Sequence, residues 1–342
     1  MFEVKNLLAD LENDMKVNRD FYRTKELLIV RELNNEHRRV FFLAIEPKEE
    51  KRLLIIPITE QMKHANLKFF PHCKGVQVER VEFAKIGPLE NQVCFTIGQT
   101  SHDKITFEAF IFNLLEELWP CRAEDVLGTI QKMLQKWHEF FSKAGDEGLT
   151  PEERRGLYGE LYFLRCLLRG GVNPSVVSFW QGPYRKNIDF ILNDTGVEMK
   201  TTLSERPLKV TISNEEQLDT DEVRTLILGV LSLKSSKYNG ELLLDIINEI
   251  RQCIRDWPLS NKMFEEALLK AGYHDMFATN YESERYIVLG RKYYKVDEDF
   301  PKLSSSMLPK GVINVKYDVI LDGLQEQIVE ESNIIQMIKQ EL

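Results

Sequence analysis

An aspartate, a glutamate and a lysine lie near the middle of the chain, at positions 189, 198 and 200. Carboxylate oxygens bind Mg²⁺ at about 2.1 Å, and the ion neutralises charge on a phosphodiester and activates a water. A nearby ammonium group can orient or deprotonate that water and stabilise the charge of the transition state. Asp189 and Glu198 are therefore candidates for holding a metal, and Lys200 is a candidate for acting on the water.

A β-hairpin would bring these side chains together. The sequence Asn-Asp-Thr-Gly at 193–196 is typical of a turn, and the apolar residues on either side predict short strands. If Leu192 pairs with Val197, Asp189 lies opposite Lys200, and strand alternation places both on the same face as the glutamate. Two carboxylates and an ammonium would then converge on a cation-sized space. In the alternative, this face is the solvent-exposed side of an ordinary hairpin.

An upstream helix carries a fourth candidate, Glu160. The residues at 150–153 combine an N-cap, a proline at the first helical position and a capping box, and two glycines at 170–171 end the helix. Glu160 falls on the apolar face, where an ionised carboxylate needs a cation, a metal or a hydrogen-bond donor. We expect it to bind the metal or to hold a metal-bound water. A structural ion pair, with Arg155, Arg165 or another arginine, is the alternative.

The motif of Asp189, eight intervening residues and Glu-Met-Lys at 198–200, with Glu160 upstream, resembles the PD-(D/E)XK nuclease superfamily. Ile188 stands where the name of the motif has proline, a change that leaves the aspartate in place. Five longer phrases resemble a bacterial branch of this superfamily and extend the resemblance over most of the chain. They lie at residues 156–161, 180–183, 197–202, 212–218 and 308–312.

The resemblance implies an α/β, restriction-endonuclease-like core in which a helix, a three-stranded meander, a second helix and a further strand follow one another. The segments near 208–212 and 226–233 fit the third and fourth strands. The resemblance also implies Mg²⁺-dependent cleavage of DNA, with Mn²⁺ as a substitute, in a restriction or phage-defence system. A catalytically inactive DNA-binding or scaffold subunit of such a system is the alternative, and methyltransferase or helicase subunits are the partners expected in either case.

The same resemblance assigns roles to individual residues. The catalytic residues that it implies are Asp189, Glu198, Lys200, Glu160 and Gln217. The residues that it implies for metal binding are Asp189, Glu198, Glu160 and Met199. Gln217 would lie on a short helix beside the site, capped by Ser213 or Asn214.

Three regions follow from the pattern of apolar residues. Residues 1–145 predict a β-rich domain with helices at its end, and the polar segment 142–148, which contains two glycines, predicts a linker. Residues 146–238 hold the nuclease-like core, and residues 239–342 predict an α+β region that packs on it. In this last region a strand is expected at 312–321 and an amphipathic helix at 325–338. The apolar face of that helix packs on the core or, in the alternative, docks a partner.

Length, charge and cysteine content limit the class of protein. The chain has 342 residues with ordinary globular composition, and its net charge of −9 excludes a surface that is basic all over. Its five cysteines are widely spaced, which gives neither a disulfide framework nor a zinc motif and favours a reducing cytoplasm. No run of apolar residues is long enough to span a membrane.

Around the motif the charge balance differs from that of the whole chain. Residues 151–210 contain nine Lys and Arg and seven Asp and Glu, a net of +2. If three of these acids bind a metal, the remaining surface would be basic and could neutralise phosphates. The loop at 179–187 adds aromatic residues, and two of them, Trp180 and Tyr184, are expected to pack against the protein and not to stack on bases.

Overall fold

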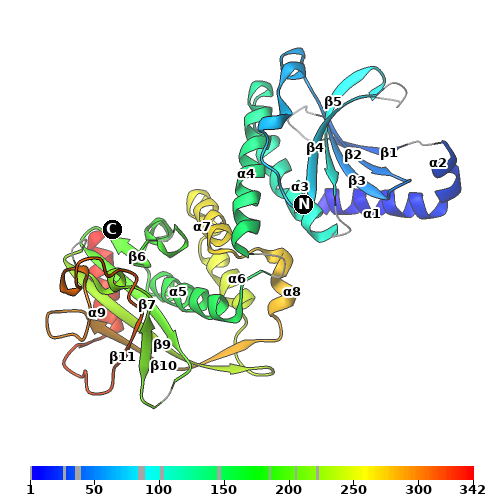
Figure 1. Cartoon of the computed structure of the whole chain (residues 1–342). Helices are drawn as coiled ribbons and strands as arrows, with labels where there is room; N and C mark the ends of the chain where they lie inside the picture. Colours follow the sequence, from blue (N-terminus) through cyan, green and yellow to red (C-terminus); the bar gives the residue numbers. More distant parts are fainter. Residues whose placement is uncertain are drawn as a thin grey trace. The chain divides into compact units, whose positions relative to one another are not determined.

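The chain forms two compact units, Met1–Lys143 and Ala144–Leu342. The predicted linker includes residues 145–147, which lie outside the described residues, and a further boundary near 238 stays a prediction. The computed structural model (Figure 1) describes residues 2–25, 28–34, 40–83, 89–100, 104–144, 148–184, 186–204, 206–220 and 223–342.

The first unit is built on a five-stranded antiparallel sheet with the strand order β1-β2-β3-β5-β4. Its strands are β1 (Ile29–Asn34), β2 (Val40–Glu46), β3 (Lys51–Pro57), β4 (Val76–Phe83) and β5 (Gln92–Gln99). The three inner strands are rich in β-branched and aromatic residues and bury most of them, as strands with neighbours on both sides do.

Helices precede and follow this sheet in the sequence. They are α1 (Phe2–Val17), α2 (Arg19–Lys25), α3 (Lys104–Leu118) and α4 (Val126–Ala144), with 3₁₀ turns η1 (Glu60–His64), η2 (Leu67–Phe69) and η4 (Ala123–Asp125). α1 and α2 are not among the expected elements, although the buried residues of α1 follow helical spacing. Buried Arg52 of β3 pairs with Glu12 of α1 and Glu108 of α3 and so joins both helices to the sheet.

The second unit contains a five-stranded mixed sheet with the order β12-β10-β9-β7-β6. Its strands are β6 (Phe190–Leu192), β7 (Thr195–Thr202), β9 (Thr225–Ser236), β10 (Arg285–Lys295) and β12 (Ile328–Val329). β7 and β9 run parallel, and the other neighbours are antiparallel. β9 is buried along most of its length, because it has a strand on each side and cover on both faces.

The expected three-stranded meander is wrong in its third strand. β8 (Lys209–Ile212) pairs with β11 (Tyr317–Ile320) in a separate two-stranded sheet, and β7 pairs with β9 instead. A 3₁₀ turn, η7 (Glu215–Leu218), stands in place of the second core helix. β8 alternates exposed and buried residues, which suits a half-exposed antiparallel pair, whereas the central position needs the apolar run of β9.

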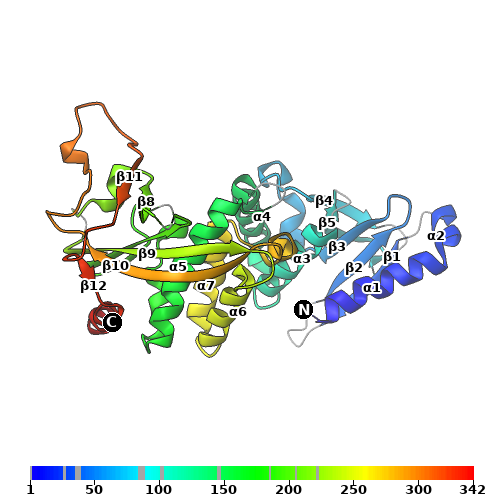
Figure 2. The same ribbon diagram turned by 90° about the horizontal axis from the view of Figure 1, so that it is seen from below.

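Helices lie on one side of the mixed sheet, and the β8–β11 pair lies on the other (Figure 2). The helices are α5 (Pro151–Arg169), α6 (Leu243–Cys253), α7 (Pro258–Ala271), α8 (Ala278–Tyr281) and α9 (Glu331–Glu341), and the further 3₁₀ turns are η5 (Pro174–Phe179), η6 (Gly182–Tyr184), η8 (Asp275–Phe277) and η9 (Ser305–Met307). Leu226 and Leu228 of β9 pack with Val210 of β8 in the core between the sheets. No helix in the described ranges is both long and apolar enough to cross a membrane.

The C-terminal segment differs from the sequence prediction in two places. The strand expected at 312–321 is confined to β11, and the residues before it form a loop. The helix expected at 325–338 begins only after β12 and continues almost to the end of the chain. Ile334 and Ile338 of α9 are fully buried, so the apolar face of this helix packs within the second unit.

Candidate active site

α5 begins as the sequence predicts and lies close against β7. The Thr150 hydroxyl accepts the NH of Glu153 at 3.3 Å, and the Glu153 carboxylate accepts the NH of Thr150 at 2.9 Å. At Gly159 an added Cβ would lie 2.5 Å from Cγ2 of Thr201 in β7, so a larger residue would push the helix away. This close packing brings the next residue, Glu160, to the strand that carries the other motif residues.

The hairpin forms, but its register differs from the expected one by two residues. Leu192 pairs with Thr195, and the turn contains only two residues. Asn193 adopts a positive φ of 36°, which closes such a tight loop. A shift of two residues preserves the alternation of side chains between the faces. Extending the observed register by one residue places Asp189 opposite Glu198 and not, as expected, opposite the lysine.

Asp189 occupies the edge of β7 beyond the end of β6. The pairing of β6 with β7 stops at Val197, and a carboxylate oxygen of Asp189 accepts the NH of Met199 at 2.8 Å. The carbonyl oxygen of Asp189 accepts the NH groups of Gln181 at 2.6 Å and Gly182 at 3.1 Å. The strand therefore fixes the side chain of Asp189, and the η6 turn fixes its main chain.

The donor that Glu160 needs is the indole of Trp180. Nε1 of this buried tryptophan donates to Oε2 of Glu160 at 2.6 Å. A Cβ added at Gly182 would collide with the same Oε2 and would lie 2.8 Å from Oδ1 of Asp189. The carboxylates of Glu160 and Asp189 thus converge on the main chain of a glycine.

The two arginines named as structural partners of Glu160 bind other acids. Arg165 forms ion pairs with Glu241 and Glu249, and Arg155 lies 3.9 Å from Glu284. The prediction of an ion pair between Glu160 and either arginine is therefore wrong. An indole donor satisfies one carboxylate oxygen without neutralising its charge.

Glu198 and Lys200 form a buried pair on β7. Nζ of Lys200 lies 2.7 Å from Oε1 of Glu198 and donates to Oε1 of Gln217 at 2.9 Å. The same Gln217 oxygen accepts the NH of Ser213 at 2.8 Å, and Asn214 caps η7. Gln217 therefore positions the ammonium group. This burial contradicts the alternative in which the charged face of the hairpin is open to solvent.

Glu198 is buried and shares its cation with other acids. Its exposed fraction is 1%, and its carboxylate lies 2.7 Å from the ammonium of Lys200. The charges of Asp189 and Glu160 act on the same ammonium. Removing a carboxylate from water costs several kcal/mol unless a partner compensates it, so one ammonium shared by three buried acids makes a further cation favourable here.

Burial raises the pKa values of all three acids. Burial and then the charge of Asp189 raise the pKa of Glu198 to about 8, against the opposing charge of Lys200. Burial raises the pKa of Asp189, and burial with the Asp189 charge raises the pKa of Glu160 well above its usual range. Burial opposes the charged form of Lys200, but the Glu198 and Asp189 carboxylates outweigh it and raise the pKa of Lys200. The pKa values of these four groups therefore depend on the charges of their neighbours in the site.

Comparison with protein families gives a match that covers most of the chain. Residues 8–322 match the model of a family described as "Putative PD-(D/E)XK family member, (DUF4420)". The chain belongs to this family. Searches of the curated proteins and of the solved structures find no match. Membership of the PD-(D/E)XK family suggests a nuclease-like fold, with which the mixed α/β architecture is compatible.

The residues of this candidate site suit a divalent cation. A bound cation would favour the ionised form of the three buried acids, whose pKa values burial raises and which share the ammonium of Lys200. Among the residues that the structure describes, no three His, Cys, Asp or Glu side chains form a group that could hold a metal ion. Mg²⁺ commonly binds one or two carboxylates and completes its shell with water, so Asp189 and Glu198 would suffice.

Met199 contacts the PD-(D/E)XK site through its main chain only. Alternation along β7 directs its side chain to the face opposite that of Glu198, where a Cβ added at Gly229 would collide with the thioether. Hard cations such as Mg²⁺ also prefer oxygen to sulfur. The thioether of Met199 is therefore not a suitable metal ligand.

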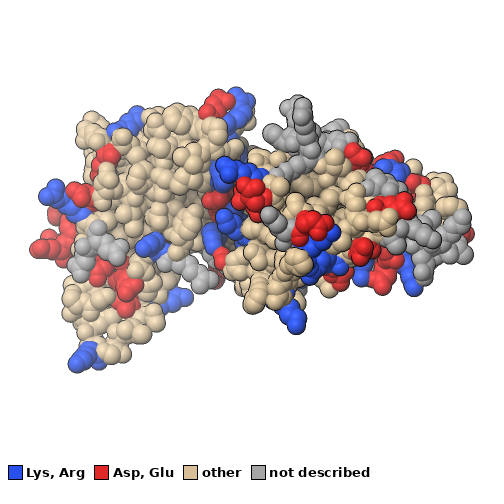
Figure 3. Space-filling view, turned by 90° about the horizontal axis from the view of Figure 1, so that it is seen from above, with Lys and Arg blue, Asp and Glu red and all other residues tan. Residues whose placement is uncertain are grey.

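The basic surface expected around the site is largely neutralised by distant acids. Arg154 and Arg155 lie near Glu284, and Arg169 pairs with Glu249. Both of these glutamates lie outside residues 151–210. On the face drawn in Figure 3, the described Lys and Arg side chains are interspersed with Asp and Glu, so no extended patch of one sign covers it.

The loop before the motif supplies two residues that sequence reasoning missed. Packing of Trp180 is confirmed by its burial and by the ring of Phe264 at 5.9 Å, but its hydrogen bond to Glu160 was not predicted. Tyr184, which was expected to pack as well, is 46% exposed. The close approach at Gly182 was not predicted either, although a glycine shortly before an acidic motif residue is a signal for such an approach. Arg185 of this loop lies outside the described residues.

Proposed function

We propose that this chain is a metal-dependent phosphodiesterase that acts as a DNA endonuclease in restriction or phage defence. The observation that carries the proposal is a cluster of three buried acids, Glu160, Asp189 and Glu198, that shares the ammonium of Lys200. Such a cluster is costly in a purely structural role. PD-(D/E)XK members are typically nucleases, which supports the same class of reaction.

Asp189 and Glu198 would hold Mg²⁺, with Mn²⁺ as a substitute. The bound ion would neutralise charge on the phosphate and activate the attacking water. The indole of Trp180 fixes one oxygen of Glu160, and the other oxygen would hold a water of the site. We assign Glu160 this second of its two expected roles because two carboxylates are enough for Mg²⁺.

Lys200 would orient the attacking water and stabilise the negative charge that develops on the phosphate. Its ammonium is fixed from two sides, by the carboxylate of Glu198 and by the amide oxygen of Gln217. A fixed donor needs no rearrangement when charge develops, which is the source of its catalytic effect. Gln217 would therefore act on the reaction through Lys200.

Cleavage of duplex DNA in Mg²⁺ or Mn²⁺ tests this proposal. The unaltered chain should cut, and EDTA should stop the reaction. Asp189→Asn and Lys200→Met should each lower the rate by about 100-fold or more, because one removes a metal ligand and the other a fixed cation. Asp194→Asn and Lys234→Met make the same changes at exposed positions and should leave the rate unchanged.

The outcomes separate the candidate functions. Equal cutting by all four variants would contradict the roles of Asp189 and Lys200. Salt-sensitive DNA binding without any cutting would favour the alternative of a catalytically inactive subunit. Methyltransferase or helicase subunits remain the partners that we propose, and co-purification with the intact chain would detect them.

A further inference from the structure

The segment 302–316, which leads from β10 to β11, exposes side chains that the active site does not use. It projects beyond β8 and β11 in Figure 2, where it is drawn in orange. Met307 and Ile313 near its tip are 60% and 72% exposed. Residues 302–316 contain three lysines and no Asp or Glu, whereas the start of the same connection, at 297–299, contains three acids. Its composition therefore combines positive charge with exposed apolar groups.

The base of this segment is fixed. The buried carboxylate of Glu215 in η7 accepts the NH of Asn314 at 3.2 Å and the NH of Val315 at 2.8 Å. At the other end, the NH of Leu303 donates to the Tyr317 hydroxyl at 3.0 Å. A buried carboxylate that accepts two main-chain NH groups holds its loop in one place.

The tip, in contrast, is held by its own turns, and no side chain elsewhere among the described residues anchors it. The NH of Met307 donates to the carbonyl of Ser304 at 3.0 Å, and the NH of Val312 donates to that of Pro309 at 3.0 Å. Across the described part of the chain, no ion pair engages Lys310 or Lys316. Their ammonium groups are therefore available to a ligand.

η7 connects this segment to the active site. Glu215 anchors the segment, and Gln217, two residues further on, accepts the hydrogen bond from Lys200. A short substrate could occupy the site without reaching the tip. A long polyanion that is bound at Lys200 and runs past η7 would meet this segment.

We propose that residues 307–316 bind the DNA duplex next to the cleaved bond, with Lys310 and Lys316 on phosphates and Ile313 in a groove. Lysines that contact phosphates position a protein on DNA, and apolar side chains inserted between them contact sugars and bases. A purely apolar tip would suit a protein partner equally well. The lysines of residues 302–316, and the lack of Asp and Glu among these residues, favour a polyanion. This inference rests on the proposed nuclease function.

A measurement of DNA binding by a full-length variant that does not cleave DNA tests this assignment. In the Asp189→Asn background with Mg²⁺, fluorescence anisotropy of a labelled duplex gives the affinity and its dependence on salt. Lys310→Gln with Lys316→Gln should weaken binding by about 10-fold or more and lower the slope of log K against log salt by about 2. Ile313→Ser should weaken binding by a few-fold and leave that slope unchanged, since it removes no charge.

Lys234→Gln with Lys237→Gln removes two exposed lysines near the far end of β9 and is the matched control. Equal effects of the two lysine pairs would overturn the proposal, because charge alone would then explain them. If the unaltered chain cuts DNA while the tip variants bind as tightly as their background, the tip has another partner and only this inference fails. If the unaltered chain neither binds nor cuts DNA, the proposed function fails as well. Equal melting temperatures of all variants would show that each is folded.

Discussion

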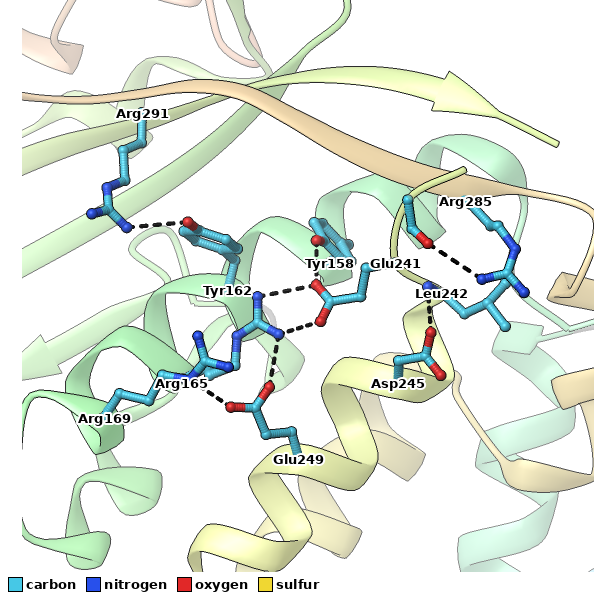
Figure 4. A network of polar contacts seen from close by, with 11 residues as sticks. Tyr158, Tyr162, Arg165, Arg169, Glu241, Leu242, Asp245, Glu249, Arg285 and Arg291 are labelled. Atoms are coloured by element: carbon cyan, nitrogen blue, oxygen red, sulfur yellow. Dashed lines mark hydrogen bonds and ion pairs between the residues drawn. The ribbon is translucent and has the colours of Figure 1, made fainter. Parts of the chain in front are cut away.

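Two groups of charged residues on α5 are built in opposite ways. Toward α6, the guanidinium of Arg165 lies between Glu241 and Glu249, and Arg169 also pairs with Glu249 (Figure 4). Two arginines thus balance two glutamates. Toward β7, Glu160 joins two further acids, and a single lysine faces all three.

The difference separates a stabilising network from a site that is ready for a ligand. In the network near α6, the Tyr158 hydroxyl also donates to Glu241 at 2.6 Å, so the acids there have several donors. In the site, three buried acids share the one ammonium of Lys200. Burial of more acids than cations costs stability in the absence of a ligand and is frequent at functional sites. The site should therefore gain from a cation, and the network should not.

The largest effect is expected from breaking the balanced network. Arg165→Met keeps most of the side-chain length but leaves Glu241 and Glu249 without their shared cation. We expect the free energy of unfolding to fall by about 3–5 kcal/mol, the range for removal of one partner of a buried pair. Urea denaturation followed by tryptophan fluorescence measures this change.

Arg169→Met is the control for this substitution, because it removes the same charge from a side chain that is 61% exposed. Its effect should stay within about 1 kcal/mol. Neither variant should change cleavage per folded molecule, since neither arginine contacts the site. Similar losses of stability in both would show that the network near α6 is not the structural support that its geometry indicates.

Glu198→Gln should have the opposite effect and stabilise the metal-free chain at alkaline pH. The pKa of this acid is about 8 in the folded chain and near 4.5 in the absence of burial. The folded state therefore holds a proton that the unfolded state has lost, and stability falls as the pH rises from about 4.5 to 8. Glutamine mimics the protonated acid at every pH, so this decline should disappear. At pH 9 we expect a gain of roughly 2–3 kcal/mol, reduced from the full shift because Lys200 loses its partner.

Urea denaturation in EDTA between pH 5.5 and 9 would measure both stability curves. If the curves for the unaltered chain and Glu198→Gln run parallel over this range, burial does not raise the pKa of Glu198. Addition of Mg²⁺ should stabilise the unaltered chain by about 1.4 kcal/mol at a concentration ten times its dissociation constant. The glutamine variant should gain less, which distinguishes a metal ligand from an acid that is merely buried.

Features that depend on neighbouring residues could be predicted from the sequence. The capping box at Thr150 and the inward direction of Glu160 follow from local spacing, the approach of Gln217 to the site follows from the family resemblance, and the structure shows all three. The register of the hairpin could not be predicted, because Asn-Asp-Thr-Gly is compatible with a turn of either two or four residues. The positive φ of Asn193 decides between them.

Features that depend on distant segments could not be predicted in the same way. β8 finds its partner in β11, more than 100 residues later, and hydrophobic periodicity contains no information on such a pairing. Counting charges between 151 and 210 predicted a basic surface, but Glu241, Glu249 and Glu284 arrive from outside that window and pair with its arginines. The network near α6 could not be predicted either, because its glutamates are distant in sequence from its arginines.

The smallest change tests whether Glu160 and Asp189 act together. The methyl group of Gly182→Ala would collide with an oxygen of Glu160 that Trp180 holds in place. We expect a loss of about 1–2 kcal/mol in stability and about 10-fold in Mg²⁺ affinity, measured by calorimetric titration. Gly156→Ala adds the same methyl group to α5 in open space and should stabilise by about 0.5–1 kcal/mol without changing Mg²⁺ binding. Unchanged Mg²⁺ affinity in both variants would separate Glu160 from the metal site and leave only the hairpin residues to hold the ion.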